Sequence, residues 1–184
     1  RCTERFNEKI ILMGAVPDLP ETDYGWVQLG KRLPSAQGGG SLRIHEVAGF
    51  REKPGPEEAQ NCFEQGHLWN TMIVVTKIKA LWRLGKRLLP EVAGKFESFQ
   101  RMLLGSRAKK KREEETGLAK LYRHIPSFDF SGNLLTQGAS QLAVMPLEGV
   151  LWSDWGRPER VFESLRRIGR EATFLEKTRR WQIR

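Results

Sequence analysis

Apolar residues near the N-terminus come in short runs that predict buried strands. Ile10 to Met13 is an unbroken apolar run that stops at Gly14, and a proline-containing loop follows it. Residues 24–29 are typical of a second strand and residues 42–50 of a third, with a polar, glycine-rich loop over residues 35–40 between them. Strand alternation in the third segment would give one face the residues Leu42, Ile44, Glu46, Ala48 and Phe50.

The middle of the chain switches between helical and strand-like spacing. Pro56 and the two glutamates that follow it are typical of a helix start, and this helix should end near Gly66. Residues 69–75 are strand-like. From residue 76 to Pro90, apolar residues recur at every third or fourth position, which predicts an amphipathic helix, and residues 91–104 are expected to form another.

Three further elements are expected toward the C-terminus. Ser127 to Asp129 is typical of a short helix start, and residues 142–146 and 149–152 are strand-like. Strands and helices therefore interleave along the chain, and we find no internal repeat. This order predicts an α/β fold with a layered, mixed β-sheet flanked by helices.

The composition sets limits on this picture. The chain has 184 residues, of which 39% are hydrophobic and 29% charged, which fits a single domain that can bury a core. No apolar run reaches the length of about 18 residues that a membrane span requires. No leader marks the chain for secretion, so we expect a cytoplasmic protein. Cys2 and Cys62 lack the spacing of a zinc site and are expected to be reduced thiols.

The charge distribution points to an anionic partner without identifying it. The chain carries 31 lysines and arginines against 22 aspartates and glutamates, a net charge of +9, which suits a nucleotide, a sugar phosphate or nucleic acid. A basic run followed at once by three glutamates predicts a charged, solvated helix or loop over residues 105–117, and residues 170–184 form a basic C-terminal tail. No stacked-aromatic or helix-turn-helix signature accompanies these residues, so nucleic-acid binding is not favoured.

Four segments, in order along the chain, carry a resemblance to a known family. They are Pro-Asp-Leu-Pro-Glu-Thr-Asp-Tyr-Gly-Trp at 17–26, Phe-Arg-Glu-Lys-Pro at 50–54, Trp-Asn-Thr-Met at 69–72 and Trp-Ser-Asp-Trp-Gly at 152–156. Together they resemble the sugar nucleotidyltransferases, and most closely the mannose-1-phosphate guanylyltransferases, over residues 10–168. The resemblance implies a nucleotide-diphospho-sugar transferase-like, Rossmann-like fold.

The resemblance also implies a reaction. Members of this family transfer a nucleoside monophosphate from a nucleoside triphosphate to a hexose 1-phosphate and release pyrophosphate. For this chain the implied substrates are GTP and mannose 1-phosphate, with Mg²⁺ as cofactor. Such a reaction depends on neutralising phosphate charge more than on acid or base catalysis. The sequence leaves open the nucleotide base, the hexose and the oligomeric state.

The triphosphate-binding motif of the family is missing from these 184 residues. Family members begin with a glycine-rich strand-loop-helix motif, and no Gly-Gly-x-Gly-x-Arg segment occurs here; the three glycines at 38–40 cannot replace it, because no Arg-Leu-x-Pro follows. We therefore expect the sugar-binding C-terminal portion of one nucleotidyltransferase domain, incomplete at its N-terminus and inactive alone. The missing half would lie in the same gene or in another chain of an oligomer. The alternative is a non-catalytic regulatory or interaction subunit on the same fold.

The resemblance assigns sugar binding to four residues, each with an ordinary structural alternative. Lys53 would bind the phosphate of the hexose 1-phosphate as a compact cation, or it is a surface lysine. Glu52 would accept hydrogen bonds from hexose hydroxyls, or it is a solvent-facing charge. Gly25 would let the hexose approach the backbone, or it is a strand kink. Asn70 would bind vicinal hydroxyls, or it closes a loop.

The segment around Asn70 departs from the family pattern. Family members carry a small pair, Ser-Gly, after the asparagine, whereas here Thr71 alone precedes Met72. The path of the backbone after Asn70, and with it the identity of the hexose, therefore cannot be carried over from the family.

Asp154 matches the family aspartate that coordinates the catalytic magnesium ion, which implies a catalytic and metal-binding role for it. Mg²⁺ prefers oxygen ligands, and one or two protein carboxylates together with substrate phosphates suffice. The alternative is that Asp154 caps a helix that begins near Arg157, where proline and glutamate follow. No catalytic role is assigned to the three scattered histidines, His45, His67 and His124.

Overall fold

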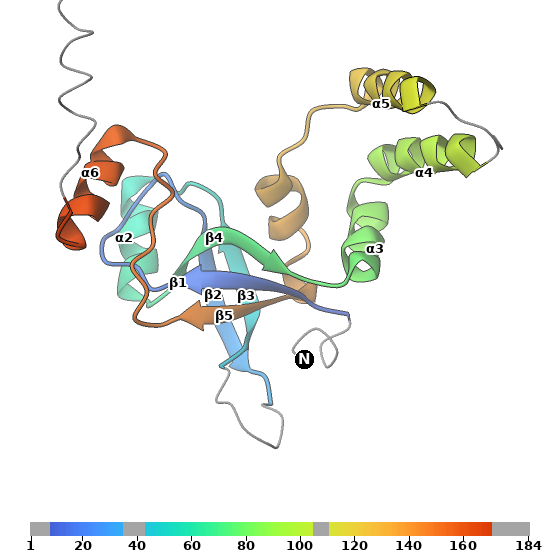
Figure 1. The fold of residues 1–184 in the computed structure, drawn as a ribbon. Helices are drawn as coiled ribbons and strands as arrows, with labels where there is room; N and C mark the ends of the chain where they lie inside the picture. The colour runs from blue at the N-terminus through green and yellow to red at the C-terminus, as the bar shows by residue number, and fades with distance from the viewer. Residues whose placement is uncertain (1–7, 35–42, 105–110, 171–184) are drawn as a thin grey trace, which may run out of the picture. The chain divides into compact units, whose positions relative to one another are not determined.

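Five strands build the sheet of this fold, which the computed structural model describes over residues 8–34, 43–104 and 111–170. They are β1 (Ile10–Ala15), β2 (Trp26–Arg32), β3 (His45–Arg51), β4 (Leu68–Val75) and β5 (Leu142–Leu147). Their order is β1-β4-β2-β3-β5, and β5 pairs again with β1, so the sheet closes on itself. The β1–β5 pair is parallel and the other pairs are antiparallel. Figure 1 shows the β2–β3 hairpin crossing the other strands steeply.

Helices connect the strands and confirm the predicted α/β class with a mixed sheet. They are α2 (Pro56–Glu64), α3 (Ile78–Leu88), α4 (Pro90–Leu104), α5 (Lys111–His124), the π-helix η1 (Phe130–Thr136), the 3-10 helix η2 (Ala139–Gln141) and α6 (Pro158–Arg167). The chain divides into two compact units, Arg1–Leu147 and Glu148–Arg184, so α6 belongs to the second unit. None of the helices in the described ranges combines the length and apolar character needed to cross a membrane.

The main core joins all five strands to α3 and η1. Apolar side chains from the strands meet Leu84 of α3 and Leu134 and Leu135 of η1. Fully burying a leucine side chain stabilises a fold by about 1.5–3 kcal/mol, so these three residues hold the helices on the sheet. The strand residues of this core are Ile10, Leu12, Val27, Val47, Phe50, Leu68, Leu142 and Val144.

The predicted face of the third strand is wrong in one respect. Val47 and Phe50 are buried, whereas Ala48 is exposed. The reason is a β-bulge: Gln28 pairs with Gly49 and the next residue of β2 pairs with Val47, so Ala48 is passed over. An extra residue of this kind reverses the alternation of faces beyond it. Residue 42 of the predicted face lies outside the described residues.

Two further strand predictions differ from the structure, one in the existence of a strand and one in where a strand ends. The strand predicted over residues 149–152 does not form, because Gly149 has a φ of +67° in the turn after β5 and the residues beyond it continue as loop. β1 does not stop at Gly14 but runs on to Ala15. A Cβ on Gly14 would lie 2.6 Å from Cδ1 of Leu68, so the glycine lets β1 lie close to β4 rather than ending the strand.

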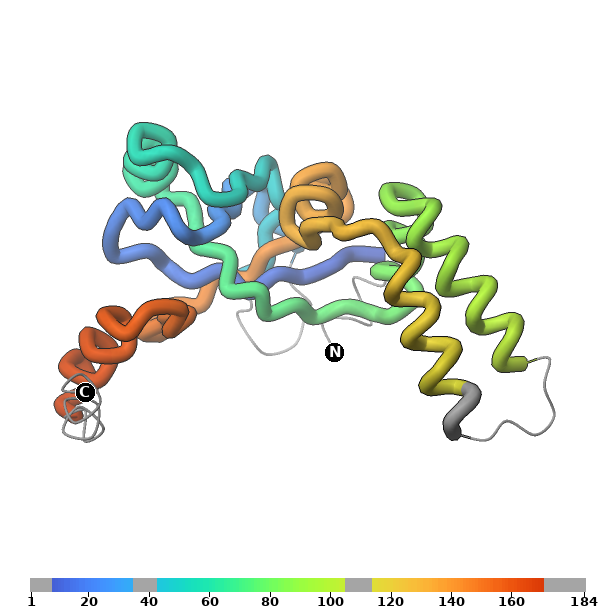
Figure 2. The backbone as a smooth tube through the Cα atoms, turned by 90° about the horizontal axis from the view of Figure 1, so that it is seen from above, coloured from blue at the N-terminus to red at the C-terminus, as the bar shows by residue number. Residues whose placement is uncertain are grey.

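Helices α4 and α5 lie side by side, as Figure 2 shows. The rings of Phe96 and Tyr122 meet edge to face with centroids 6.2 Å apart. A Cβ on Gly117 of α5 would lie within 2.9 Å of Phe99 in α4, so the helices approach closely there. The charged segment predicted over residues 105–117 lies partly outside the described residues; residues 111–117 begin α5. Of the basic tail, only Arg170 is described.

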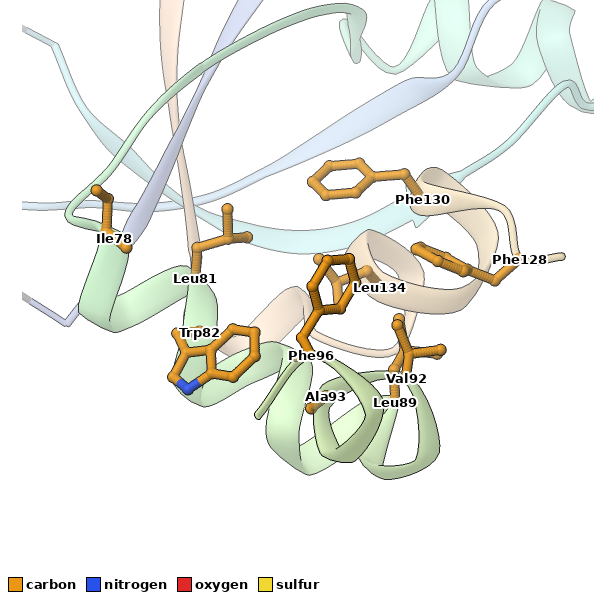
Figure 3. A pocket seen from close by; sticks show the side chains of 11 residues that line it. Ile78, Leu81, Trp82, Leu89, Val92, Ala93, Phe96, Phe128, Phe130 and Leu134 are labelled. Atoms are coloured by element: carbon orange, nitrogen blue, oxygen red, sulfur yellow. The ribbon is translucent and has the colours of Figure 1, made fainter. Parts of the chain in front are cut away.

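An apolar pocket of about 200 Å³ lies between α3, α4 and the segment around η1. Figure 3 shows side chains from these elements converging on it. Aromatic rings make up much of its wall, and the residues that line it have no charged or hydrogen-bonding side chain other than the indole of a tryptophan. They are Ile78, Leu81, Trp82, Gly85, Leu89, Val92, Ala93, Phe96, Phe128, Phe130 and Leu134.

Candidate functional site

Three of the predicted sugar-binding residues meet where neighbouring strands begin or end. Gly25 directly precedes β2, Glu52 directly follows β3, and Asn70 lies in β4. The backbone N–H of Asn70 donates a 2.7 Å hydrogen bond to the carbonyl oxygen of Gly25. A Cβ built on Gly25 would lie 2.8 Å from Oε2 of Glu52. The sheet therefore brings these residues from three strands to one place.

The absence of a side chain at Gly25 has a visible packing reason. Besides the Glu52 carboxylate, an added Cβ would meet Cζ of Phe50 at 3.0 Å. Phe50 is one of the largest fully buried side chains and belongs to the main core, so its ring has little room to withdraw. Gly25 thus leaves space for the Glu52 carboxylate beside the backbone. The alternative that Gly25 is only a kink in the strand does not account for this close approach.

Aromatic rings support the strand starts next to Gly25. Trp26 pairs with Trp69 across β2 and β4, and their ring centroids lie 6.1 Å apart in an edge arrangement. The Trp26 indole N–H donates to the backbone carbonyl of Glu21 at 2.8 Å. Tyr24 meets Trp69 edge to face at 5.0 Å. Buried rings in such pairs have few alternative rotamers, so this wall is rigid.

Glu52 is partly buried and interacts with a helix that lies far away in the sequence. Burial raises the pKa of Glu52 above its ordinary value, and the negative charge of Asp129 raises it further, while the Lys53 ammonium lowers it. Glu52 is therefore partly buried rather than the fully solvent-facing charge of the alternative interpretation.

Asp129 begins η1 and organises its first turn. Its carboxylate accepts hydrogen bonds from the backbone N–H groups of Ser131 at 3.2 Å and Gly132 at 2.5 Å. Its own N–H donates to the side-chain oxygen of Asn133 at 2.8 Å. This is a reciprocal helix cap, and it confirms the helix start predicted over Ser127 to Asp129. The sequence analysis did not single out Ser131, because no local pattern links it to Met72, whose Sδ its hydroxyl contacts at 3.5 Å.

Asn70 is buried and makes internal contacts with both polar atoms of its side chain. Its Oδ1 accepts a hydrogen bond from the N–H of Met72 at 3.2 Å, and its Nδ2 donates to Sδ of the same residue at 3.0 Å. These two contacts tie the Asn70 side chain to the irregular segment of β4 that follows it. A hexose hydroxyl that bonds to Nδ2 has to displace only a sulfur acceptor, which is weak.

The unusual sequence after Asn70 forms an irregularity in β4. Leu12 of β1 pairs with Val74, but Gly14 pairs with Asn70, so β4 carries extra residues between these pairs. The hydroxyl of Thr71 donates to the carbonyl oxygen of Met13 at 2.7 Å and so ties this bulge to β1.

Backbone strain in this chain is concentrated at the candidate residues. Among the described residues, three that are not glycine have a positive φ: Lys53 at +45°, Met72 at +59° and Trp155 at +51°. Lys53 is a candidate itself, Met72 follows Asn70 by two positions, and Trp155 follows Asp154. Each such conformation costs about 1–3 kcal/mol and is typical of functional sites. These three segments therefore share the backbone strain that is common at functional sites.

Asp154 lies in the second unit, and its carboxylate contacts an arginine of α6. Arg160 Nη1 lies 2.8 Å from Oδ1 and 3.0 Å from Oδ2, and the N–H of Gly156 donates to Oδ1 at 3.0 Å. The N-cap of α6 is Arg157, without a side-chain cap. The helix-cap alternative for Asp154 is thus wrong, because the turn through Trp155 places the carboxylate on Arg160 instead.

Comparison with known proteins decides the family. The family model described as nucleotidyl transferase matches residues 2–171. The chain belongs to the nucleotidyl transferase family. Mannose-1-phosphate guanylyltransferase ManC of Salmonella typhimurium is 30% identical over 151 residues, 80% of this chain and 29% of ManC. A mannose-1-phosphate guanylyltransferase of Salmonella montevideo is 42% identical over 64 residues, 34% of this chain and 13% of that protein. This nucleotidyl transferase chain therefore spans less than a third of either relative.

Two solved structures share the fold of this nucleotidyl transferase chain. A mannose-1-phosphate geranyltransferase from Thermus thermophilus has a TM-score of 0.62 at 24% identity, covering 90% of this chain and 41% of that one. A mannose-6-phosphate isomerase from Helicobacter pylori has a TM-score of 0.58 at 16% identity, covering 83% and 55%. At these identities the likeness concerns the fold, and with the family match it confirms the predicted nucleotidyltransferase-like fold.

The donors of this nucleotidyl transferase chain suit a divalent cation only in part. Within residues 8–34, 43–104 and 111–170, no three His, Cys, Asp or Glu side chains gather into a group that could hold a metal ion. Asp154 is a single partly exposed carboxylate with an arginine partner of opposite charge. Mg²⁺ is commonly held by one or two carboxylates plus substrate phosphates, so Asp154 fits as one ligand and further ligands have to come from elsewhere.

Proposed function

We propose that this chain is the sugar phosphate side of an enzyme that transfers a nucleoside monophosphate from GTP to mannose 1-phosphate and releases pyrophosphate. The family supports nucleotidyl transfer, and the names of the Salmonella relatives support GTP and mannose 1-phosphate. The observation that carries the proposal is the meeting of Gly25, Glu52 and Asn70 at adjoining strand ends. The chain covers 29% of ManC, and the proposal assigns the complete activity to a longer protein or assembly that contains it.

The hexose would lie against the backbone at Gly25. Hydroxyl groups there can donate to the Glu52 carboxylate, which accepts hydrogen bonds without donating any when ionised. Hydrogen bonds to a charged acceptor contribute about 1.5–3 kcal/mol each, so one carboxylate can hold two vicinal hydroxyls firmly. The Asn70 amide would add a donor on the opposite side once it leaves the Met72 sulfur.

Lys53 would bind the phosphate of the hexose 1-phosphate. Its side chain is exposed and directly follows Glu52, and its charge acts on the Glu52 carboxylate. The positive φ of Lys53 changes the chain direction just before Pro54. A cation beside the hexose-binding carboxylate suits a ligand that carries hydroxyls and a phosphate on one ring.

Asp154 would hold a magnesium ion that neutralises the charge of the transferred phosphate. Arg160 now occupies both carboxylate oxygens, so it has to share or leave one of them when a cation binds. An arginine next to that carboxylate also provides positive charge for a phosphate oxygen. Asp154 and Arg160 would therefore act together on phosphate charge rather than as an acid and a base.

The proposal is tested by titrating the chain with mannose 1-phosphate in a calorimeter. We expect mannose 1-phosphate to bind more tightly than mannose or inorganic phosphate. Mannose lacks the phosphate that Lys53 would bind, and inorganic phosphate lacks the hydroxyls that Glu52 and Asn70 would bind. Gly25→Ala should abolish it, since the added methyl displaces the Glu52 carboxylate. Gly55→Ala is the matched control, because a Cβ there meets nothing within 4 Å. A chain that binds mannose 1-phosphate no better than inorganic phosphate, or a Gly25→Ala variant that binds normally, would overturn the proposal.

A further inference from the structure

We propose that Met72 is a specificity-determining residue whose thioether stands in for one hydroxyl of the hexose, so that the site also accepts hexose 1-phosphates that lack this hydroxyl. The family pattern has a small pair after the asparagine, and it therefore assigns no role to a methionine at this place. The inference rests on the proposed function for the placement of the hexose beside Asn70. The contacts of the Met72 sulfur are independent of it.

The Asn70 side chain presents a nitrogen donor to this sulfur. Asn70 is 4% exposed, and its backbone N–H donates to the carbonyl oxygen of Gly25 at 2.7 Å, so the residue has a fixed place at the site. The backbone N–H of Met72 can only donate, and it lies 3.2 Å from Oδ1 of Asn70. This contact orients the amide so that Nδ2 donates to Sδ of Met72 at 3.0 Å.

A second buried donor reaches the same sulfur from a distant part of the sequence. The hydroxyl of Ser131 in η1 donates to Sδ of Met72 at 3.5 Å, and Ser131 is 5% exposed. Its backbone N–H donates to the Asp129 carboxylate at 3.2 Å, which holds the start of η1 in place. Donors from β4 and η1 therefore converge on one acceptor. A thioether is a weak acceptor, so a hydroxyl oxygen at this place would accept both hydrogen bonds more strongly.

Burial does not explain why a methionine side chain lies at this position. Met72 is 51% exposed, and its φ of +59° costs backbone strain in any residue other than glycine. The hydroxyl of Thr71 ties the bulge to the carbonyl oxygen of Met13, so the backbone path before Met72 does not depend on the methionine side chain. What the methionine supplies at this place is a sulfur acceptor for two buried donors.

This arrangement changes how the site discriminates between sugars. A hexose hydroxyl beside Asn70 displaces the sulfur, and the unbranched, flexible Met72 side chain moves into the solvent that already borders it. A hexose without that hydroxyl leaves the sulfur in place, so the donors keep an acceptor and the thioether meets an apolar carbon. Sites whose donors depend on a substrate hydroxyl reject the deoxy analogue by about 10⁴–10⁵-fold. Met72 removes much of this penalty and so extends the substrate range to deoxyhexose 1-phosphates.

The test is calorimetry of the full chain with mannose 1-phosphate and its monodeoxy analogues, each of which lacks a different hydroxyl. One analogue should bind within about tenfold of mannose 1-phosphate, because the sulfur replaces its missing hydroxyl. Met72→Leu keeps the bulk of the side chain but removes the acceptor. It should weaken binding of that analogue by about tenfold or more relative to mannose 1-phosphate, and leave the ratios for the other analogues unchanged. Met102→Leu, at a methionine of α4 that is 46% exposed, is the matched control and should change no ratio.

NMR of the chain with labelled methionine methyl groups observes the displacement itself. The Met72 signal is assigned by its loss in Met72→Leu. It should move much further on addition of mannose 1-phosphate than on addition of the tolerated analogue, because only the first ligand displaces the sulfur. Equal movements with the two ligands would overturn the displacement.

The outcomes separate this inference from the proposed function. If mannose 1-phosphate binds but every monodeoxy analogue is rejected, or if the tolerance persists in Met72→Leu, the role of Met72 is overturned and the proposed function stands. A chain that binds neither mannose 1-phosphate nor any analogue overturns the proposed function, and this inference with it. If Met72→Leu does not fold, Met72→Ala, which also lacks the sulfur, decides in the same way.

Discussion

The two faces of η1 border regions of opposite character. One face carries Ser131, which is buried and whose hydroxyl donates to Sδ of Met72 in the irregular segment after Asn70. The other carries Phe130 and Leu134, which line the apolar pocket with α3 and α4 (Figure 3). The polar site is made of strand ends with strained backbone, whereas most of the pocket wall comes from the amphipathic helices α3 and α4. In this chain, irregular backbone accompanies the candidate polar residues, while the apolar wall follows mainly from helical periodicity.

Leu134→Ala tests the apolar face of η1 and should have the largest effect on stability. Leu134 is shared between the main core and the pocket wall, so its truncation opens a cavity and should lower the free energy of unfolding by about 2–5 kcal/mol. Urea denaturation followed by circular dichroism measures this. Phe128→Ala, at an exposed position of the same wall, is the control and should cost clearly less. Equal losses in the two variants would contradict the assignment of Leu134 to the core.

Lys53→Ala should weaken the use of mannose 1-phosphate at the polar site without lowering the stability of the fold. In the complete enzyme we expect kcat/KM for mannose 1-phosphate to fall by about 10²-fold or more, with little change in affinity for the triphosphate, since Lys53 is assigned to the sugar phosphate. The free energy of unfolding should stay nearly constant, because the side chain is exposed. Lys120→Ala on the exposed surface of α5 is the control. Equal weakening toward both substrates would argue against the assignment.

Asp154→Asn tests the proposed magnesium role of Asp154, which lies in the strained segment of the second unit. In the complete enzyme, turnover should fall about tenfold or more and the magnesium requirement should rise, because a neutral carbonyl is a poorer ligand for a hard cation. Steady-state kinetics at several magnesium concentrations measure both. Glu163→Gln breaks the exposed pair with Arg167 and should change neither. Normal turnover at an unchanged magnesium requirement would leave Asp154 as the partner of Arg160 alone.

Met72→Gly should have the smallest effect on stability. It tests whether the positive φ at residue 72 costs free energy of folding. Glycine accepts the φ of +59° without the cost that a side chain incurs, so the chain should be stabilised by up to about 1 kcal/mol. Met72→Ala removes the sulfur but keeps the strain, and should not be stabilised. Thermal unfolding of the two variants provides the comparison. A Met72→Gly variant less stable than Met72→Ala would show that the positive φ stores no strain that glycine relieves.

The sequence predicted the elements better than their irregularities. Helical spacing from residue 76 to Pro90 located α3, and apolar runs located β1 and β5, because burial dictates those periods. The bulge at Ala48 could not be foreseen, since one skipped residue leaves the local composition unchanged. The strand expected at 149–152 failed for a similar reason: the apolar residues were present, but Gly149 turned the chain away.

The candidate site was predictable where it depended on motifs and unpredictable where it depended on tertiary contacts. Glu52 and Lys53 were found from their shared segment. The contact from the Ser131 hydroxyl to Met72 joins elements that are far apart in the sequence, so only the folded chain reveals it. The same holds for Asp154, where helix-start chemistry suggested a cap but the carboxylate reached Arg160 in the first turn of α6.

The closure of the sheet by β5 has a consequence for how the chain folds. β1 lies between β4 and β5, and Ile10 pairs with Leu142, while β3 pairs with the same late strand. During synthesis both early strands therefore expose an unpaired edge until residues 142–147 have emerged. Pairing across such a separation raises the contact order and slows folding, and open strand edges invite association with other chains. The last strand of the sheet thus determines both when folding can finish and how long the nascent chain is at risk of aggregation.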